Sequence, residues 1–451
     1  MSSTAIDSVV FRDIFSTGAM RGIFSDENRI QKYLDVEAAL ARVQARLGII
    51  PAEAAEEIQR QSRLEKFDMA KIEQRTALVG YPVLPVVEEL VDLCSGDLGQ
   101  WAHWGATTQD ITDTATVLQV REALSIIDDD LNAICESLAG LAQRYRDTPM
   151  AGRSNLQQAV PVTFGFKIAV LLAAFRRHRA RLAQLRPRVL VGQFGGAAGT
   201  LASLGTRGLE VQSALMRELG LGQPEIAWHT ARDGFAEAAC FLGLVTGTLG
   251  KVATDVKLMM QTEVSEVMEP FEPGRGSSST MPQKRNPISC NFILACASVV
   301  RQNVAALLEA MVADHERSTG PWEIEWIALP EVFLLTGGAL CHARRMLAGL
   351  HVDPARMRAN LEVTGGLIAS EAVMMALAPY LGRERAHDLV YEICRRSVET
   401  QTPLIELLCQ SPEISRHVDR AALSKLADPA NYLGLSAKMV DRVLSGRTGA
   451  D

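Results

Sequence analysis

Apolar side chains recur every three or four residues over long stretches of this chain. The clearest stretch starts at Val117 and continues through seven further apolar positions: Val120, Leu124, Ile127, Leu131, Ile134, Leu138 and Leu141. This spacing puts them on one face of a helix, as in helices that pack in bundles. Three more stretches of the same period lie at 168–185, 242–259 and 293–311. Because no segment alternates β-branched residues with period two, the sequence predicts an all-α fold around a central bundle of long helices.

Helix-end signals and breaks in the apolar pattern indicate how the chain is divided. Near the start, Ser25 can cap a helix that Gly48 ends, and Pro51 opens the next helix. Glycine- and proline-rich breaks follow at 96–105, 149–153, 192–205 and 274–287. We therefore expect three helical domains, at residues 1–110, 111–360 and 361–451.

Composition excludes several classes of function. The 451 residues carry 46 basic and 53 acidic side chains, a formal net charge of −7, so no basic surface for nucleic acid is expected. The eight cysteines show no CxxC spacing, which argues against a metal site or a disulfide framework. The first 15 residues lack the features of a signal peptide, and no uninterrupted apolar run reaches about 18 residues. We therefore expect a cytoplasmic protein without a membrane partner.

The segment 274–287, with the sequence GRGSSSTMPQKRNP, differs from the apolar helical chain around it. Flexible serine-rich segments are often linkers, but this one also holds a lysine and an asparagine, Lys284 and Asn286. Its literal string from Ser278 to Pro287 resembles the signature loop of the fumarase/aspartase superfamily. Two more regions resemble that superfamily, at 103–114 (HWGATTQDITDT) and at 153–165 (RSNLQQAVPVTFG). The resemblance implies a three-domain helical fold and a homotetramer with shared active sites.

The resemblance also implies roles for particular residues. Removing or adding a proton next to a carboxylate passes through an aci-carboxylate, so such a site needs a positioned acid or base and fixed donors. Ser278 matches the superfamily's catalytic serine, Lys284 and Asn286 match carboxylate-holding donors, and His103 matches a site histidine. Further matches to substrate-binding positions are Thr107, Thr108 and Gln261.

Three other segments resemble the 3-carboxy-cis,cis-muconate cycloisomerase branch: 193–199 (QFGGAAG), 228–233 (WHTARD) and 315–326 (HERSTGPWEIEW). By this resemblance, substrate-binding roles are expected for His229, Arg232, His315, Arg317 and Trp326. Adenylosuccinate lyases commonly carry an arginine for the nucleotide phosphate where this chain has Trp326. The resemblance therefore implies a small di- or tricarboxylate substrate, with no metal and no cofactor.

Asn155 and Gln158 depart from the superfamily pattern. Amine- and water-eliminating members carry a histidine acid where this chain has Asn155, and cycloisomerases often carry histidine at the position of Gln158. Asparagine cannot protonate a leaving group, but a carboxylate, with a pKa of about 4, leaves unaided. We therefore expect interconversion of 3-carboxy-cis,cis-muconate and a carboxymuconolactone, with Ser278 as acid and base and Asn155 and Gln158 contacting substrate. The resemblance also implies a place in the degradation of protocatechuate-type aromatics.

Other interpretations remain open. The chain could be a fumarate-releasing C–N lyase that acts on an aminosuccinate, or a non-catalytic oligomeric homologue. The glycines at 192–199 resemble a dinucleotide loop, but they miss the GxGxxG spacing. His178 is expected to be a core or interface histidine, and Asp128, Asp129 and Asp130 a solvated helix face.

Overall fold

A computed structural model describes residues 4–318 and 320–446 of the chain. Internal contacts divide it into two units, which we describe separately: unit 1 is Met1–Leu131, His178–Gly250 and Phe292–His342, and unit 2 is Asn132–Arg177, Lys251–Asn291 and Ala343–Asp451. The α-helices are α1 (Arg12–Phe15), α2 (Gly18–Ile23), α3 (Asp26–Arg46), α4 (Ala52–Gln61), α5 (Met69–Val79), α6 (Val83–Leu93), α7 (Thr108–Arg144), α8 (Phe164–Val189), α9 (Gly208–Leu219), α10 (Asp233–Met259), α11 (Ile288–Glu309), α12 (Pro321–Ala348), α13 (Pro354–Leu361), α14 (Ser370–Leu381), α15 (Arg383–Thr400), α16 (Leu404–Gln410), α17 (Pro412–Ser415), α18 (Arg420–Ala427) and α19 (Ser436–Leu444). The strands are β1 (Pro149–Ser154), β2 (Gln157–Thr163), β3 (Val267–Met268) and β4 (His351–Val352).

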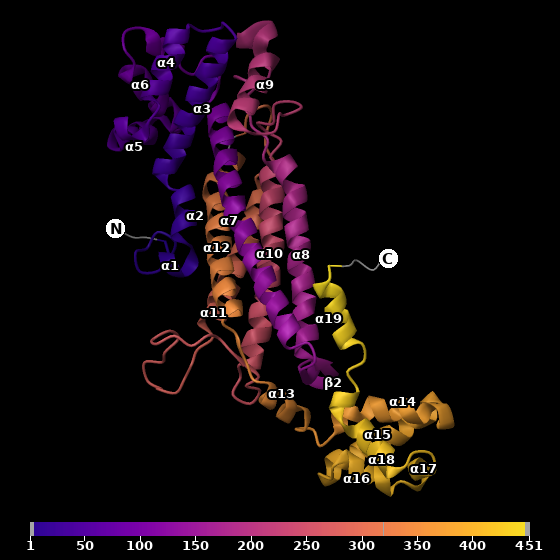
Figure 1. Cartoon of the computed structure of the whole chain (residues 1–451). Coiled ribbons are helices and arrows are strands. Elements are labelled where there is room, and N and C mark those ends of the chain that lie inside the picture. The colour runs from indigo at the N-terminus through magenta and orange to yellow at the C-terminus, as the bar shows by residue number, and fades with distance from the viewer. Residues whose placement is uncertain (1–3, 319, 447–451) are drawn as a thin grey trace. The chain divides into compact units, whose positions relative to one another are not determined.

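The N-terminal helices of unit 1 form where the sequence predicts them. The Ser25 hydroxyl accepts a hydrogen bond from the Asn28 amide and caps α3, and Gly48 adopts a positive φ of 66° just after that helix. Figure 1 shows α3, α4, α5 and α6 gathered together. Their apolar faces share one core cluster, which includes Leu34, Ile58 and Leu90.

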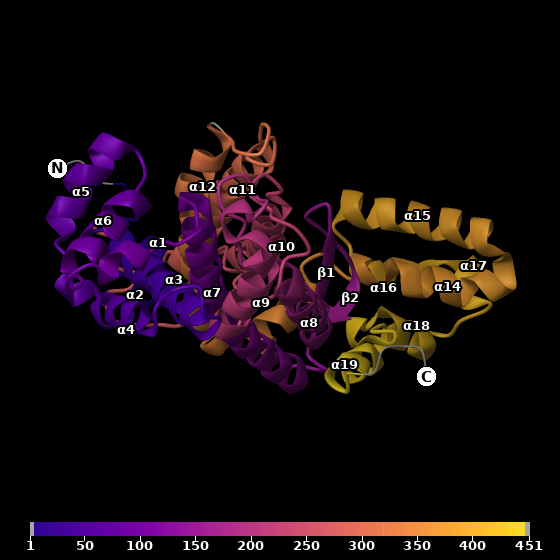
Figure 2. The same cartoon turned by 90° about the horizontal axis from the view of Figure 1, so that it is seen from above.

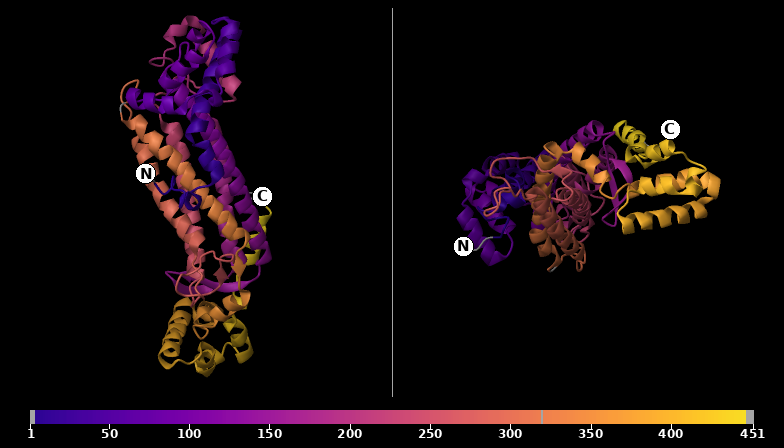
Figure 3. Two further views of the ribbon diagram at one scale, coloured as in Figure 1. Left: turned by 90° about the vertical axis from the view of Figure 1, so that its left-hand side faces the viewer. Right: turned by 90° about the horizontal axis from the view of Figure 1, so that it is seen from below.

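The long helices carry their apolar stripes inside the protein. On α7, Val120, Leu124, Ile127 and Leu131 are all 0% exposed. The unit 1 segments of α11 and α12 run side by side in Figures 1 and 3, and the Asn303 amide on α11 donates to Glu331 on α12. The predicted all-α fold with a long-helix bundle is confirmed.

Unit 2 contains a β-hairpin and the C-terminal helices. Strands β1 and β2 pair antiparallel, with Ser154 opposite Gln157, and β3 pairs with β4. Figure 2 shows α14 and α15 side by side, and they share a core cluster with α16 and α18. The sequence predicted only a break near residue 149, so the hairpin was missed. The domain boundaries near residues 110 and 360 stay predictions.

Three helices, α10, α11 and α12, are long and apolar enough, by length and composition alone, to cross a membrane. The most apolar windows of α10 and α12 are 61% and 67% buried inside the chain, but that of α11 is only 28% buried. Most of that window of α11 is therefore left unburied by the residues that the structure describes, and the expected absence of a membrane partner stays a prediction.

Candidate active site

The N-terminus of α7 is fixed by one buried carboxylate in unit 1. Asp110 lies in the first turn of α7, and its side chain is 0% exposed. Its two oxygens accept hydrogen bonds from the backbone amides of Gly195 and Gly196, both at 2.8 Å, and from the Thr107 amide at 3.0 Å. His229 Nε2 lies 2.8 Å from the same carboxylate. Asp110 thus joins the glycine-rich segment and the His229 segment to the helix end that carries Thr107.

The close approach of the 192–199 segment to neighbouring protein atoms explains why glycines are needed in it. A Cβ on Gly195 would lie 2.9 Å from the Cβ of Ala227, and Gly196 adopts a positive φ of 73°. Their amides are used by Asp110, so they pack against protein rather than cradle a phosphate. His229 is buried and its Nε2 is engaged by the same carboxylate, and the substrate-binding role expected for it stays a prediction.

His103 is held by a second buried carboxylate, on α3. Glu37 is 1% exposed, and its oxygens lie 2.6 Å from His103 Nδ1 and accept the His103 backbone amide at 3.1 Å. Burial lowers the pKa of His103, but the charge and hydrogen bond of Glu37 outweigh burial and raise it above its usual range. Nδ1 donates to Glu37, so Nε2 is the ring atom left to face a substrate.

Arg232 lies inside unit 1 with both sides of its guanidinium occupied. It is 3% exposed, donates to Asp113 at 2.7 and 2.9 Å and to Glu325 at 2.9 Å, and its guanidinium carbon lies 5.0 Å from the Trp228 ring centre. Burial opposes the charge of Arg232, but the two carboxylates raise its pKa. Burial also raises the pKa of Glu325. The substrate-binding role expected for Arg232 stays a prediction, since its donors are engaged within the protein.

An open pocket of about 200 Å³ brings together three of the predicted substrate-binding residues. Its lining residues are Tyr81, Thr107, Thr108, Gln109, Arg317, Ser318 and Trp322. Arg317 donates to the side-chain oxygen of Gln109 at 2.5 Å and to the carbonyl of Ala197 at 2.7 Å. His315 is exposed and has a positive φ of 48°, but it does not line this pocket.

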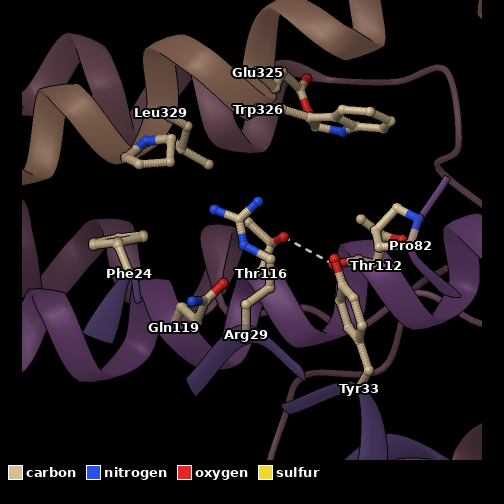
Figure 4. A pocket seen from close by; sticks show the side chains of 11 residues that line it. Phe24, Arg29, Tyr33, Pro82, Thr112, Thr116, Gln119, Glu325, Trp326 and Leu329 are labelled. Atoms are coloured by element: carbon tan, nitrogen blue, oxygen red, sulfur yellow. Dashed lines mark hydrogen bonds between the residues drawn. The ribbon is translucent and has the colours of Figure 1, made fainter. Parts of the chain in front are cut away.

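Trp326 lines a second, smaller pocket of about 50 Å³ (Figure 4). Arg29 and Tyr33 reach it from α3, Thr112 from α7 and Trp326 from α12. Burial raises the pKa of Tyr33 to about 12. The Nε atoms of Arg29 and Trp326 are buried without a hydrogen-bond partner among the described residues. Such donors suit a water molecule or another acceptor.

The two ends of the serine-rich loop of unit 2 are held together by hydrogen bonds. Ser277 and Arg285 form a β-bridge, and the backbone and side-chain amides of Asn286 donate to the Gly276 carbonyl at 3.1 and 3.0 Å. The guanidinium carbon of Arg285 lies 4.5 Å from the Phe271 ring centre. These contacts gather Ser278, Lys284 and Asn286 on one short loop.

The Ser278 hydroxyl oxygen accepts two backbone amides within that loop, from Met281 at 3.0 Å and from Thr280 at 3.3 Å. Ser278 is half-buried, and Lys284 is exposed. Amides directed at an oxygen favour its negatively charged form, because they solvate the charge that develops when the proton leaves. This geometry helps a serine to give up its proton.

Asn155 stands at the tip of the β1–β2 hairpin. Asn155 and Leu156 form the two-residue turn and have positive φ angles of 50° and 64°, as a type I′ turn requires. Gln158, one pair below, donates to the Asn360 carbonyl at 2.7 Å. Arg153 on β1 forms an ion pair with the buried Glu266 at 2.7 Å.

Gln261 lies in the turn after α10, exposed, and its carbonyl accepts the amides of Val264 and Ser265. Within unit 1, therefore, Thr107, Thr108 and Arg317 meet, with His103 and His229 fixed to the same region. Within unit 2, the serine-rich loop and the hairpin each hold predicted residues. The roles of all these residues stay predictions.

Sequence reasoning missed Tyr81, Glu37 and Ser318. The motif 315–326 contains Ser318 and Trp322, so a signal was present there, although Thr319 of that motif lies outside the described residues. Glu37 lies 66 positions from His103 and has no local signal.

Comparison with known proteins shows which family this chain resembles. A family model described as "Lyase" matches residues 15–301, and one described as "Adenylosuccinate lyase C-terminus" matches residues 366–443. The chain is 56% identical to trans-aconitate decarboxylase 1 of Mycosarcoma maydis, covering 97% of this chain and 89% of that protein. It is 48% identical to 3-carboxy-cis,cis-muconate cycloisomerase of Pseudomonas aeruginosa, covering 97% and 96%.

The crystal structure of the 3-carboxy-cis,cis-muconate lactonizing enzyme from Pseudomonas putida superposes with a TM-score of 0.92. The two sequences are 43% identical, and the match covers 97% of this chain and 98% of that one. Fold, loop sequence and relatives agree over the whole length, and the chain is an enzyme of the fumarate lyase superfamily.

Proposed function

We propose that the enzyme acts on an unsaturated tricarboxylate and that Ser278 protonates an aci-carboxylate intermediate. The observation that carries this proposal is the loop in which the Ser278 oxygen accepts two backbone amides, beside Lys284 and Asn286. When Ser278 gives its proton to carbon, the amides of Thr280 and Met281 stabilise the alkoxide that remains. Lys284 and Asn286 stabilise the charge on the carboxylate until that proton arrives.

The first candidate reaction is the lactonisation of 3-carboxy-cis,cis-muconate. One substrate carboxylate oxygen forms a bond to an alkene carbon, and the alkene electron pair moves to the carbon beside a second carboxylate. That carbon then takes the proton from Ser278, so one C–O and one C–H bond form and one π bond is lost. The relative of 48% identity that carries this name supports this candidate.

Asn155 fits a reaction whose leaving group needs no proton. In the reverse of lactonisation the group expelled is a carboxylate, which is stable as an anion at neutral pH. An amine would need a general acid, and the asparagine amide cannot serve as one. A fumarate-releasing C–N lyase would therefore need another acid.

A second candidate is decarboxylation of a trans-aconitate-like tricarboxylate, because the relative with that name is 56% identical to this chain. The bond to the departing carboxylate breaks, and its electron pair forms a new alkene. The displaced alkene pair moves to the carbon beside another carboxylate, which then takes a proton. One CO2 leaves and one proton is taken up, and CO2, like a carboxylate, leaves without a general acid.

Both reactions share the aci-carboxylate, so the same loop serves either. The proposal includes a cytoplasmic homotetramer with shared active sites and no metal or cofactor, in degradation of aromatic acids for the first candidate. The apolar surface of α11, which is 28% buried in this chain, supports assembly.

The test is to incubate purified enzyme separately with 3-carboxy-cis,cis-muconate, trans-aconitate and adenylosuccinate, and to follow products by proton NMR. A lactone supports the first candidate, loss of CO2 the second, and fumarate the C–N lyase alternative. We expect Ser278→Ala to lower turnover by about 10²- to 10⁴-fold.

Ser279→Ala, one position further along the same loop, is the matched control and should retain turnover. Near-normal turnover in Ser278→Ala would contradict the proposed role. Tight binding of a tricarboxylate without any turnover by the wild-type protein would indicate a non-catalytic homologue.

A further inference from the structure

We propose that the 200 Å³ pocket beside Thr107 and Thr108 binds the additional carboxylate of a tricarboxylate, and that Tyr81 and Ser318 make it selective for that group. This inference rests on the proposed function and names the part of unit 1 that recognises the substrate class. None of the sequence motifs points to Tyr81. Its place in the lining comes from the fold alone.

The first support is a buried donor without a partner. Ser318 is 6% exposed, and its hydroxyl oxygen has no hydrogen-bond partner among the described residues. A buried hydroxyl that makes no hydrogen bond is costly, so its position on the pocket wall indicates that a ligand or water completes it. Because a hydroxyl can donate, a carboxylate oxygen is a suitable partner.

The second support is a positive charge that no carboxylate balances. Arg317 donates only to neutral acceptors, the Gln109 side chain and the Ala197 carbonyl, in the part of the chain that the structure describes. These two contacts hold the guanidinium in a fixed orientation at the pocket. An arginine fixed in this way is well suited to bind a carboxylate.

The third support is an aromatic wall. Tyr81 stacks on Trp322, with ring centres 6.0 Å apart and an interplanar angle of 18°. Trp326 packs edge-on against both rings, at angles of 85° and 77°. Gly80, with a φ of 87°, ends α5 and turns the chain, and Tyr81 stays 40% exposed. A conjugated, planar acid can lie against such a wall while the Tyr81 hydroxyl donates to it.

The test compares two unreactive probes that share one carbon chain, tricarballylate and glutarate, which differ by the central carboxylate. Binding of each to the full-length enzyme is measured by calorimetry. We expect wild-type enzyme to prefer tricarballylate, and Tyr81→Phe and Ser318→Ala each to weaken tricarballylate binding by roughly tenfold to a hundredfold, with glutarate affinity unchanged. Tyr391→Phe, at an exposed tyrosine of α15, is the matched control and should change neither affinity.

Turnover gives a second readout. With the tricarboxylate that the enzyme converts, Tyr81→Phe should raise KM and leave kcat nearly unchanged, because the lost contact is equally present in the ground state and the transition state. If wild-type enzyme binds tricarballylate no better than glutarate, or if both variants keep the wild-type preference, the inference is wrong. If the preference is present but no tricarboxylate is turned over, the proposed function fails and the binding site stands.

Discussion

At the scale of single residues, His103 shows how one buried partner sets the state of a side chain. Burial alone would lower the pKa of His103, yet the Glu37 carboxylate at 2.6 Å reverses the direction. The imidazole is therefore protonated over a wider pH range than a free histidine. A cationic His103 can balance the negative charge of a polycarboxylate substrate.

We predict that Glu37→Gln lowers the pKa of His103, measured by NMR titration of the histidine ring protons with His103→Gln as the assignment control. The wild-type pair stabilises the fold most below the unfolded-state pKa of about 6.5, and this stabilisation is lost as pH rises through the raised folded pKa. The difference in unfolding free energy between wild type and Glu37→Gln should therefore shrink from pH 6 upward. A pKa that stays raised in the variant would show that Glu37 is not the cause.

The residues that sequence could identify were those inside a contiguous string. Ser278, Lys284 and Asn286 lie within nine positions of one another, and the structure places them on one loop. Glu37 and Tyr81 contact residues that are distant in sequence, so no local sequence motif indicates a role for them. Their contacts come from the packing of helices, and such contacts cannot be read from a single sequence.

At the scale of secondary-structure elements, Asp110 connects three segments that are distant in sequence. Its oxygens accept the amides of Gly195 and Gly196 separately, one on each oxygen. The end of α7 and the glycine-rich segment are therefore fixed together before any ligand binds. The Thr107 amide donates to the same carboxylate, so the residue just before α7 is held together with these segments.

We predict that Asp110→Asn destabilises the protein by about 2–4 kcal/mol, because one amide would then face an NH2 group instead of an oxygen. Thermal unfolding followed by circular dichroism should show a midpoint several degrees lower. Asp128→Asn is the control, since its side chain is 40% exposed beside Arg179 and Arg186, and its effect should be small. Equal midpoints for the two variants would contradict the role assigned to Asp110.

The contacts that close the serine-rich loop allow a second prediction at this scale. A Cβ on Gly276 would lie 2.8 Å from the Asn286 carbonyl oxygen, whereas Gly274, also at positive φ, has nothing within 4 Å. We expect Gly276→Ala to lower kcat/KM by at least tenfold and Gly274→Ala to cost less, because only the first change displaces Asn286. Steady-state kinetics on both variants measure this, and equal losses would show that φ strain alone matters.

At the scale of the whole molecule, α11 has more apolar surface than residues 4–318 and 320–446 cover. Its most apolar window is 28% buried, and Ala295 and Val299, one turn apart, are both exposed. Large exposed apolar surfaces in such proteins mark contacts with other molecules. Further copies of this chain are the partner we propose, and the assembly would have closed symmetry.

We predict that the double change Ala295→Glu and Val299→Glu lowers the mass of the assembly, measured by sedimentation velocity. Two buried negative charges would oppose helix–helix contact between copies. Leu78→Glu, at an exposed position on α5, should leave the mass unchanged. Wild-type protein that sediments as a monomer would overturn the assembly proposal.

The fold was predictable because apolar residues recur every three or four positions in long helices, as the buried residues from Val120 to Leu138 on α7 show. The β1–β2 hairpin was not, because its strands are short and its turn lacks the usual glycine. Asn155 and Leu156 both take positive φ angles, and leucine is an unusual residue for that conformation. Such a turn is visible only in three dimensions.

The conformation of the β1–β2 hairpin tip also affects which side chains can replace Asn155. Asparagine, aspartate and histidine are the non-glycine side chains that most readily occupy the left-handed backbone of residue 155. A replacement there exchanges an inert amide for a proton donor without touching a core contact. On the role proposed for Asn155, the leaving group that such an enzyme can expel would therefore depend on an exposed hairpin position that can change without disturbing the buried core.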